Sequence, residues 1–321
     1  MRRRSGRRYG ASWSQAARRP RPGTSWRPEM LAHALDSLLN RSFSEPDAAA
    51  WPVGTRRVDT RAGRIRVLDT GGKGPVVLMV PDGPNVIEHH ADVLARLRPH
   101  ARVVCFDLPG FGWSKPPMSY RHRLQDGAAA VLAVMDALEI REAALHFSCA
   151  NGLYAIAAAK LAPQRIRRLL LCQTPSMQSM RGWTQKNVPK PLQVPVVGQV
   201  LMRVARRRFA GVWYGIALPD KSRFDEFHAP ADHALTHGAC FCLAGVVQGL
   251  SHARDGELEG VKTPTLLIWG DRDRSHRRTR AESLQDLMPQ ARVEHFADCG
   301  HFPDLEQPQR YAELALATIN A

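Results

Sequence analysis

The chain has 321 residues and is 44% hydrophobic, which is enough to bury a large core in one or two domains, and no apolar run is long enough to cross a bilayer. Its formal net charge is +15, but the first 29 residues hold nine arginines and one glutamate, which leaves +7 for the rest. Because that remainder lacks basic clusters interleaved with aromatic residues, the charge predicts neither a nucleic-acid partner nor a membrane partner.

Residues 1–29 are mostly Arg, Ser, Gly and Pro, and this composition predicts a disordered tail. No apolar stretch follows Arg8, so a secretory signal peptide is not predicted. A solvated tail, or an unused upstream start before Met30, fits the composition better than a transit peptide or an anion-binding arm. The six cysteines show neither the spacing of a disulfide framework nor a CxxC pair, so we expect a reduced, cytoplasmic protein.

Residues 30–43 predict a short amphipathic helix with Leu31, Ala34, Leu35 and Leu38 on its apolar face. Such a face docks either on the body of its own chain or on a second copy of the chain. We favour docking on the same chain, and a homodimer is the alternative.

Short apolar runs then predict the first strands of a sheet. Residues 55–59 and 64–69 predict an antiparallel pair, and the continuous apolar run 76–80 is typical of a strand buried on both faces. Residues 102–107 predict the next strand. The glycine-rich stretch after Asp69 is followed by a proline and not by a helix. It is therefore expected to be a turn and not a phosphate-binding loop.

An Ala-rich helix over residues 124–138 leads into the stretch around which the rest of the chain is organised. Residues 143–147 predict a short apolar strand, and residues 153–161 are rich in strong helix formers, so a sharp turn must join them. A side chain at such a turn is lifted clear of the sheet, above the free N–H groups of the helix start. A further strand is predicted at 168–173, and this alternation is typical of a parallel sheet with right-handed crossovers.

The alternation pauses over residues 176–260, whose composition predicts several short helices. It resumes with strands predicted at 264–270 and 291–296, and the chain closes with a helix at 310–319. Polar side chains directly follow both of these late strands.

Three stretches resemble the α/β-hydrolase superfamily: the strand, turn and helix described above, the sequence DLPGFGWSKP from Asp107, and the sequence CGHFPDLEQPQRY from Cys299. The resemblance implies an α/β fold with an eight-stranded, mostly parallel sheet and helices on both faces. It implies a core of residues 30–175 and 261–321 and an inserted helical cap of residues 176–260. The aromatic residues expected in the ceiling of the pocket under this cap are Trp183, Trp213, Tyr214, Phe224 and Phe241.

The resemblance also implies a nucleophile at the turn. Counted from both flanking motifs of the family, the register places Cys149 in the nucleophile position, and Ser148 is the alternative one residue earlier. Two neighbours depart from the family pattern, because Phe147 replaces a small residue and Asn151 replaces a glycine. A large side chain such as that of Phe147 is expected to destabilise a strained turn, whereas Asn151 would tolerate a positive φ.

The partners of the nucleophile are implied by the same resemblance. Asp273 matches the acid, with Asp271 as second choice, and His301 matches the histidine. The backbone N–H groups of Gly83 and Ala150 would form the oxyanion hole. In the oxyanion loop the family's His-Gly pair is replaced by Pro81 and Asp82, and the latter would bring a carboxylate near the oxyanion.

These residues imply attack by a thiolate, whose pKa the helix start and an imidazolium at His301 would have to lower. The expected reaction is hydrolysis of an ester, thioester, lactone or C–C bond in a small, largely apolar substrate, without a cofactor. An acyltransferase using the same triad and a ligand-binding protein with a degenerate turn are the alternatives. Since no Asp stands at the turn, a dehalogenase or an epoxide hydrolase is disfavoured.

Two further patterns have weaker meaning. His233 and His237 have the spacing of a metal pair on one helix face, but HALTH lacks the glutamate of HExxH, so no metal is predicted. The run RSHRRTR over 274–280 predicts a solvated start of a helix. Its alternative role is contact with an acidic substrate or a nucleotide-bearing thioester.

Overall fold

The computed structural model describes residues 28–40, 51–254 and 256–321, so nearly all of the predicted tail lies outside the described residues. Within them, one sheet has eight strands in the order β1-β2-β4-β3-β6-β7-β9-β10. The strands are β1 (Thr55–Thr60), β2 (Gly63–Asp69), β3 (Val76–Met79), β4 (Arg102–Phe106), β6 (Ala143–Ser148), β7 (Ile166–Cys172), β9 (Thr265–Gly270) and β10 (Arg292–Phe296). β2 pairs antiparallel with β1 and β4, and the remaining pairs are parallel. The predicted α/β fold is confirmed.

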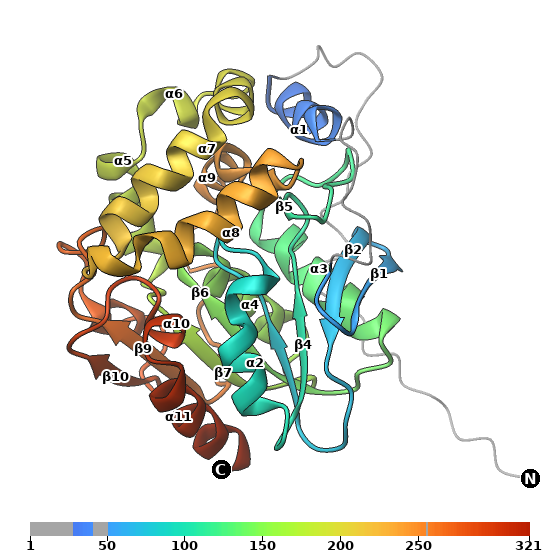
Figure 1. The fold of residues 1–321 in the computed structure, drawn as a ribbon, viewed down its shortest axis with the longest axis vertical. Coiled ribbons are helices and arrows are strands. Elements are labelled where there is room, and N and C mark those ends of the chain that lie inside the picture. Colours follow the sequence, from blue (N-terminus) through green and yellow to red (C-terminus); the bar gives the residue numbers. More distant parts are fainter. Residues whose placement is uncertain (1–27, 41–50, 255) are drawn as a thin grey trace, which may run out of the picture.

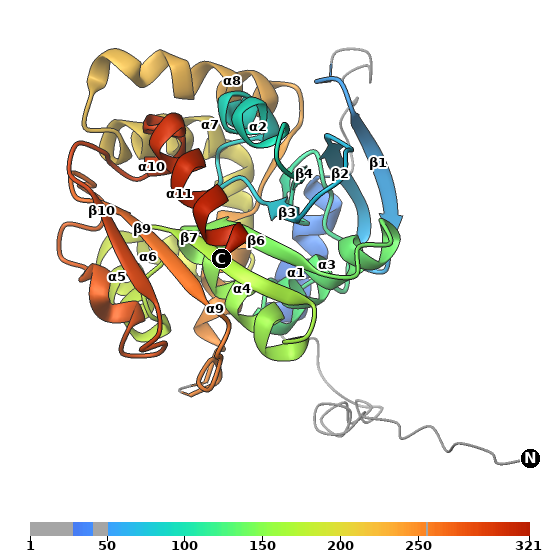
Figure 2. The same ribbon diagram turned by 90° about the horizontal axis from the view of Figure 1, so that it is seen from below.

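Helices cover both faces of this sheet (Figure 2). α3 (Leu124–Ala137) and α4 (Cys149–Leu161) lie on one face, and α2 (Ala91–Leu97) and α11 (Pro308–Asn320) lie on the other. Side chains alternate along a strand, so Leu78 of β3 joins one core and its neighbours Val77 and Met79 join the other. This is why β3 was recognisable as an uninterrupted apolar run.

Five α-helices between β7 and β9 lie together over one end of the sheet (Figure 1). They are α5 (Met177–Asn187), α6 (Lys190–Gln193), α7 (Val197–Ala217), α8 (Phe224–Thr236) and α9 (Leu243–Ser251). We call residues 177–251 the helical insertion. A small antiparallel pair of β5 (Phe111–Gly112) and β8 (Cys240–Phe241) joins the insertion to the loop after β4.

The first described helix, α1 (Pro28–Leu39), docks on α7 and α9 of its own chain, but with an unexpected face. Leu31 and Leu38 are 43% and 47% exposed, whereas the buried residues include His33 and Asp36. The predicted orientation is therefore wrong. The cause is a buried polar contact, because Asp36 Oδ2 accepts a hydrogen bond of 3.3 Å from Gln199 Nε2 of α7. None of the described helices is both long and apolar enough to cross a membrane.

Helices α3 and α4 pack so closely that Gly127 leaves no room for a side chain. A Cβ there would lie 2.2 Å from the Tyr154 ring, whereas a Cβ at Gly215 of α7 would meet nothing within 4 Å. We expect Gly127→Ala to lower the free energy of unfolding by about 1–3 kcal/mol through overpacking. Gly215→Ala should raise it by about 0.5–1 kcal/mol by restricting the unfolded chain. Urea unfolding measures both, and equal effects of the two changes would contradict the close packing.

Candidate active site

The turn between β6 and α4 presents Cys149. Cys149 has a φ of 50°, in the left-handed region that side chains other than glycine rarely adopt. Ser148 ends the strand in an extended conformation, is buried, and lies against Cys172. The structure thus places the sulfur of Cys149 at the strained turn and directs the hydroxyl of Ser148 elsewhere.

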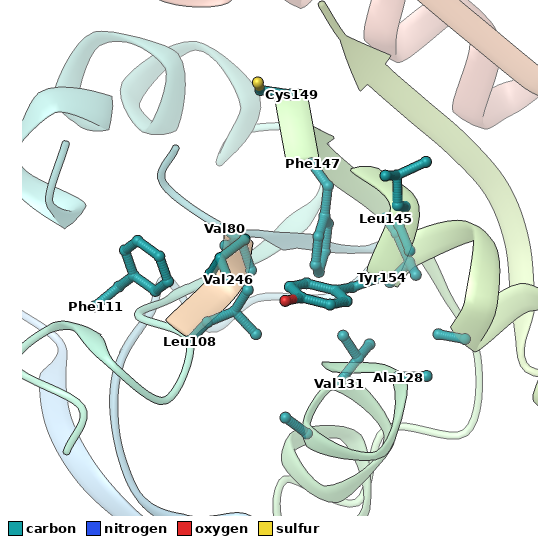
Figure 3. Close-up of a cluster of buried hydrophobic side chains, with 14 of the residues drawn as sticks. Val80, Leu108, Phe111, Ala128, Val131, Leu145, Phe147, Cys149, Tyr154 and Val246 are labelled. Carbon is teal, nitrogen blue, oxygen red and sulfur yellow. The ribbon is translucent and has the colours of Figure 1, made fainter. Parts of the chain in front are cut away.

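The two departures from the family pattern are accommodated in different ways. Phe147 is completely buried and is directed toward Tyr154, away from Cys149 (Figure 3). Asn151 lies in the helical part of α4, so the positive φ expected there falls on Cys149 instead. The Asn151 side chain donates a hydrogen bond of 3.4 Å to the Pro81 carbonyl, which ties the helix to the loop after β3.

Cys149, His301 and Asp273 come together from three different strand ends. The sulfur lies within 4.8 Å of a ring nitrogen of His301, and His301 Nδ1 is 2.7 Å from Asp273 Oδ2. Asp271 is exposed and pairs with His295 at 2.7 Å instead. The geometry of a nucleophile, a base and an orienting acid is therefore present with Asp273, and not with Asp271, as the acid.

The carboxylate of Asp273 is saturated with hydrogen bonds. Gln173 Nε2 donates to Oδ2 at 2.7 Å, while the backbone N–H and hydroxyl of Ser275 donate to Oδ1 at 2.8 and 2.7 Å. Burial alone would raise the pKa of Asp273, but the charge and hydrogen bond of His301 outweigh it and hold the pKa well below its usual range. Gln173 gave no signal in the sequence, since its role depends on a backbone with a φ of 48°.

The His301 ring is completely buried among aromatic rings. Trp213 and Phe302 meet it edge-on, with centroids 4.8 and 5.1 Å away, and His276 stacks on it at 5.4 Å. Burial by itself would lower the pKa of His301, but the charges of Asp273 and Cys149 and the hydrogen bonds of Asp273 and Asp82 raise it well above its usual value. The imidazolium form is therefore favoured in this arrangement.

His276 is a second histidine in the site, and the sequence analysis missed it. Its Nε2 is 3.9 Å from the Cys149 sulfur, and its ring is almost parallel to that of Trp183, with centroids 5.2 Å apart. Burial lowers the pKa of His276 to about 3, so the ring is neutral. The prediction that residues 274–280 are exposed to solvent is therefore wrong for His276, which is buried. Its position three residues after Asp273 was the available signal.

The carboxylate of Asp82 contacts the ring nitrogen of His301 that Asp273 leaves free. Its Oδ2 is 3.1 Å from His301 Nε2, and burial raises the pKa of Asp82. Burial also raises the pKa of the Cys149 thiol, and the charge of Asp82 adds to this effect. His301 and the hydrogen bond of the Ala150 N–H lower the pKa of Cys149, but by less than burial and Asp82 raise it. The expected lowering of the pKa of Cys149 is thus absent in this arrangement.

Gly83 and Ala150, the expected oxyanion donors, come from the loop after β3 and from the first turn of α4. The Ala150 N–H is close enough to the sulfur to favour the thiolate. Gly83 is packed against aromatic rings, since a Cβ there would lie 2.5 Å from Phe111 and 3.2 Å from Phe241. Only glycine fits this close approach.

The aromatic residues predicted for the pocket ceiling separate into two groups. Trp183, Trp213 and Phe241 border the site through His276, His301 and Gly83 respectively. The other two were predicted wrongly, because Tyr214 packs on Phe227 and Phe302 in the second core, and Phe224 stacks on His228.

His233 and His237 lie one turn apart with ring centroids 4.2 Å from each other. Neither belongs to a group of three potential metal ligands within the described part of the chain. The groups that do occur there are Cys149, His276 and His301; Asp36, His122 and Cys242; and His90, His146 and Asp304.

The family is decided by comparison of the chain with known proteins. Residues 77–314 match the model of the alpha/beta hydrolase family. The chain belongs to this family. The prediction that it is an α/β-fold hydrolase is confirmed.

The relatives that the chain matches differ in substrate. It is 24% identical over 256 residues to the 2-hydroxy-6-oxo-2,4-heptadienoate hydrolase of Pseudomonas putida, covering 77% of this chain and 89% of that protein. It is 24% identical over 274 residues to haloalkane dehalogenase 2 of Mycobacterium tuberculosis, covering 83% and 95%. The solved enol-lactonase from Burkholderia xenovorans LB400 shares the fold, with a TM-score of 0.69, 19% identity and coverage of 83% and 100%.

The raised pKa of Cys149 has a measurable consequence. We expect its alkylation by iodoacetamide, followed by peptide mass spectrometry, to keep accelerating with pH beyond about 8.5, where an ordinary thiol is half ionised. A rate that is already constant at neutral pH would show instead that Cys149 rests as a thiolate.

Replacement of Asp82 tests its effect on the thiol. Asp82→Asn removes the carboxylate charge while keeping the shape, so alkylation of Cys149 at pH 7 should be roughly three to ten times faster, where tenfold corresponds to one pKa unit. Asp271→Asn, which removes an exposed carboxylate of the same loop region as Asp273, is the matched control and should change nothing. An unchanged or slower reaction in Asp82→Asn would refute the inhibitory role of Asp82.

Proposed function

We propose that the protein hydrolyses an acyl bond of a small substrate through Cys149, His301 and Asp273. The observation that carries this proposal is the left-handed backbone at Cys149, which holds the sulfur within 4.8 Å of the histidine that Asp273 orients. Strain of this kind is retained where the surrounding structure imposes it, and it is common at catalytic turns.

The reaction begins when His301 Nε2 turns from Asp82 to the sulfur. Nε2 leaves its proton on Asp82, whose pKa burial raises, and then takes the proton of the Cys149 thiol, so that a thiolate–imidazolium pair forms. The sulfur attacks the acyl carbon, and the N–H groups of Gly83 and Ala150 receive the developing oxyanion. The leaving group takes a proton from His301, and water later cleaves the thioester to Cys149, giving up its proton to the histidine.

Several features support a largely apolar acyl group. Phe111, Phe241, Trp183 and Trp213 border the site, and the helical insertion that supplies most of them would act as a cap that excludes water. The Nε1 of Trp213 is buried and has no acceptor within the described residues. A substrate oxygen would satisfy this donor. Esters, thioesters, lactones and C–C bonds next to a carbonyl all fit these contacts.

A ligand-binding protein without turnover is the second candidate. The observation that favours it is the hydrogen bond of Asp82 to His301 Nε2, which engages the atom that the thiol needs. The two candidates differ in one result, because only an enzyme becomes acylated.

A burst experiment decides between them. The protein is mixed with p-nitrophenyl butyrate, quenched in acid within seconds and analysed by peptide mass spectrometry. We expect release of p-nitrophenol and a butyryl adduct on Cys149. Cys149→Ala should lose both, with a decrease in rate on the order of 1,000-fold or more, whereas Ser148→Ala should retain them. An adduct on Ser148 would overturn the assignment. Release of p-nitrophenol without an adduct in the original protein or in Ser148→Ala would overturn it as well.

We also propose that the protein works in the cytoplasm. All six cysteines are free and buried, and the proposed reaction needs a reduced thiol at Cys149. A reducing compartment maintains this state.

A further inference from the structure

A cavity of about 550 Å³ lies outside the catalytic cluster, between α5 and the loop that follows Asp273. Its lining residues are mostly polar or charged. The charged ones are Lys186, Arg274, Arg277, Arg278, Arg280 and Asp286. A volume of this size is within the range of sites for small organic molecules, about 300–1,000 Å³.

The cavity concentrates positive charge. Five of its lining residues are cations, four of them arginines from the single run 274–280, and Asp286 is its one carboxylate. Arg277, Arg278 and Arg280 are exposed and form no ion pair with a carboxylate among the described residues. Like charges that line one cavity repel one another, and an anion bound there would relieve that repulsion.

The wall of the cavity is also the wall of the catalytic site. Trp183 Nε1 donates to the Ser275 carbonyl at 2.8 Å, and the Trp183 ring stacks on His276. His276 lies 3.9 Å from the Cys149 sulfur on the other side of this stack. A molecule that fills the cavity is therefore beside the reacting sulfur but not on it, as the remote part of a substrate would be.

We propose that this cavity binds the phosphate groups of the substrate, so that the acyl bond cleaved at Cys149 belongs to a phosphorylated or nucleotide-bearing ester or thioester. A carboxylate is satisfied by one bidentate arginine, whereas four arginines and a lysine suit an anion with several charges. The identification of the substrate rests on the proposed function, but binding of phosphate does not.

The chemistry leaves the phosphates unchanged. The Cys149 sulfur forms a bond to the acyl carbon as the bond from that carbon to the leaving sulfur or oxygen breaks. The phosphate-bearing leaving group receives a proton from His301. Water then releases the acid, so one acyl bond and one water are consumed and no oxidant or reductant is needed.

Isothermal titration calorimetry on the full chain tests the site. At low ionic strength, inorganic pyrophosphate and coenzyme A should both bind, and malonate should bind at least tenfold more weakly. Arg277→Glu with Arg278→Glu should weaken pyrophosphate binding at least tenfold. The matched control is Arg98→Glu with Arg141→Glu, which changes the net charge equally at two exposed arginines elsewhere and should keep the affinity.

Three results would overturn the proposal: no binding of pyrophosphate, equal weakening by the two double variants, or malonate binding as tightly as pyrophosphate. The titrations are repeated in Cys149→Ala. Retained binding in a protein without turnover then separates failure of the proposed reaction from failure of this site.

Steady-state kinetics with two thioesters tests whether the cavity recognises the phosphate groups of the substrate. The Arg277→Glu, Arg278→Glu variant should raise KM for acetyl-coenzyme A at least tenfold and leave kcat and KM for S-acetyl-N-acetylcysteamine, which lacks phosphate, unchanged. Equal changes for both thioesters would refute recognition of the phosphates as part of the substrate.

Discussion

A completely buried imidazole whose charged form is favoured is the constraint on which the site depends. A charge without water is stable only if paired and hydrogen-bonded, and His301 is held between Asp273 on Nδ1 and Asp82 on Nε2. Asp273 is in turn fixed by Gln173 and Ser275. The ends of β3, β7 and β9 and the loop after β10 thus meet at one ring, and the sheet keeps them in register.

The sequence was sufficient for features that depend on local pattern and on order along the chain. The strand β3 is an uninterrupted apolar run because both of its faces are covered, and the motifs around the turn placed Cys149 and His301 in the family register. Interactions between distant segments left no such pattern. His276 lay hidden in an arginine-rich run, and Gln173 depends on one unusual backbone angle. The helix α1 buries Asp36 and exposes Leu38, because its polar partners on α7 cannot be inferred from helix periodicity.

The raised pKa of Cys149 makes the thiol a weaker nucleophile at neutral pH, and it also affects how readily the sulfur is oxidised. Thiolates are the form that peroxides oxidise, so a buried cysteine that is kept protonated is protected from oxidation. Asp82 contributes to this protection as long as it is ionised. The carboxylate at Asp82, which stands in place of the family's His-Gly pair, therefore affects the protonation of the proposed nucleophile.

The carbonyl of Ala217, at the end of α7, accepts a hydrogen bond of 3.1 Å from the backbone N–H of His301, and Trp213 from the same helix packs on the ring. At Gly300 a Cβ would lie 2.2 Å from that same carbonyl, so the two segments are in direct contact. The helical insertion is consequently not an exchangeable module. Grafting the insertion of another hydrolase onto this core would therefore remove the support of His301, and any redesign of the insertion has to keep the end of α7.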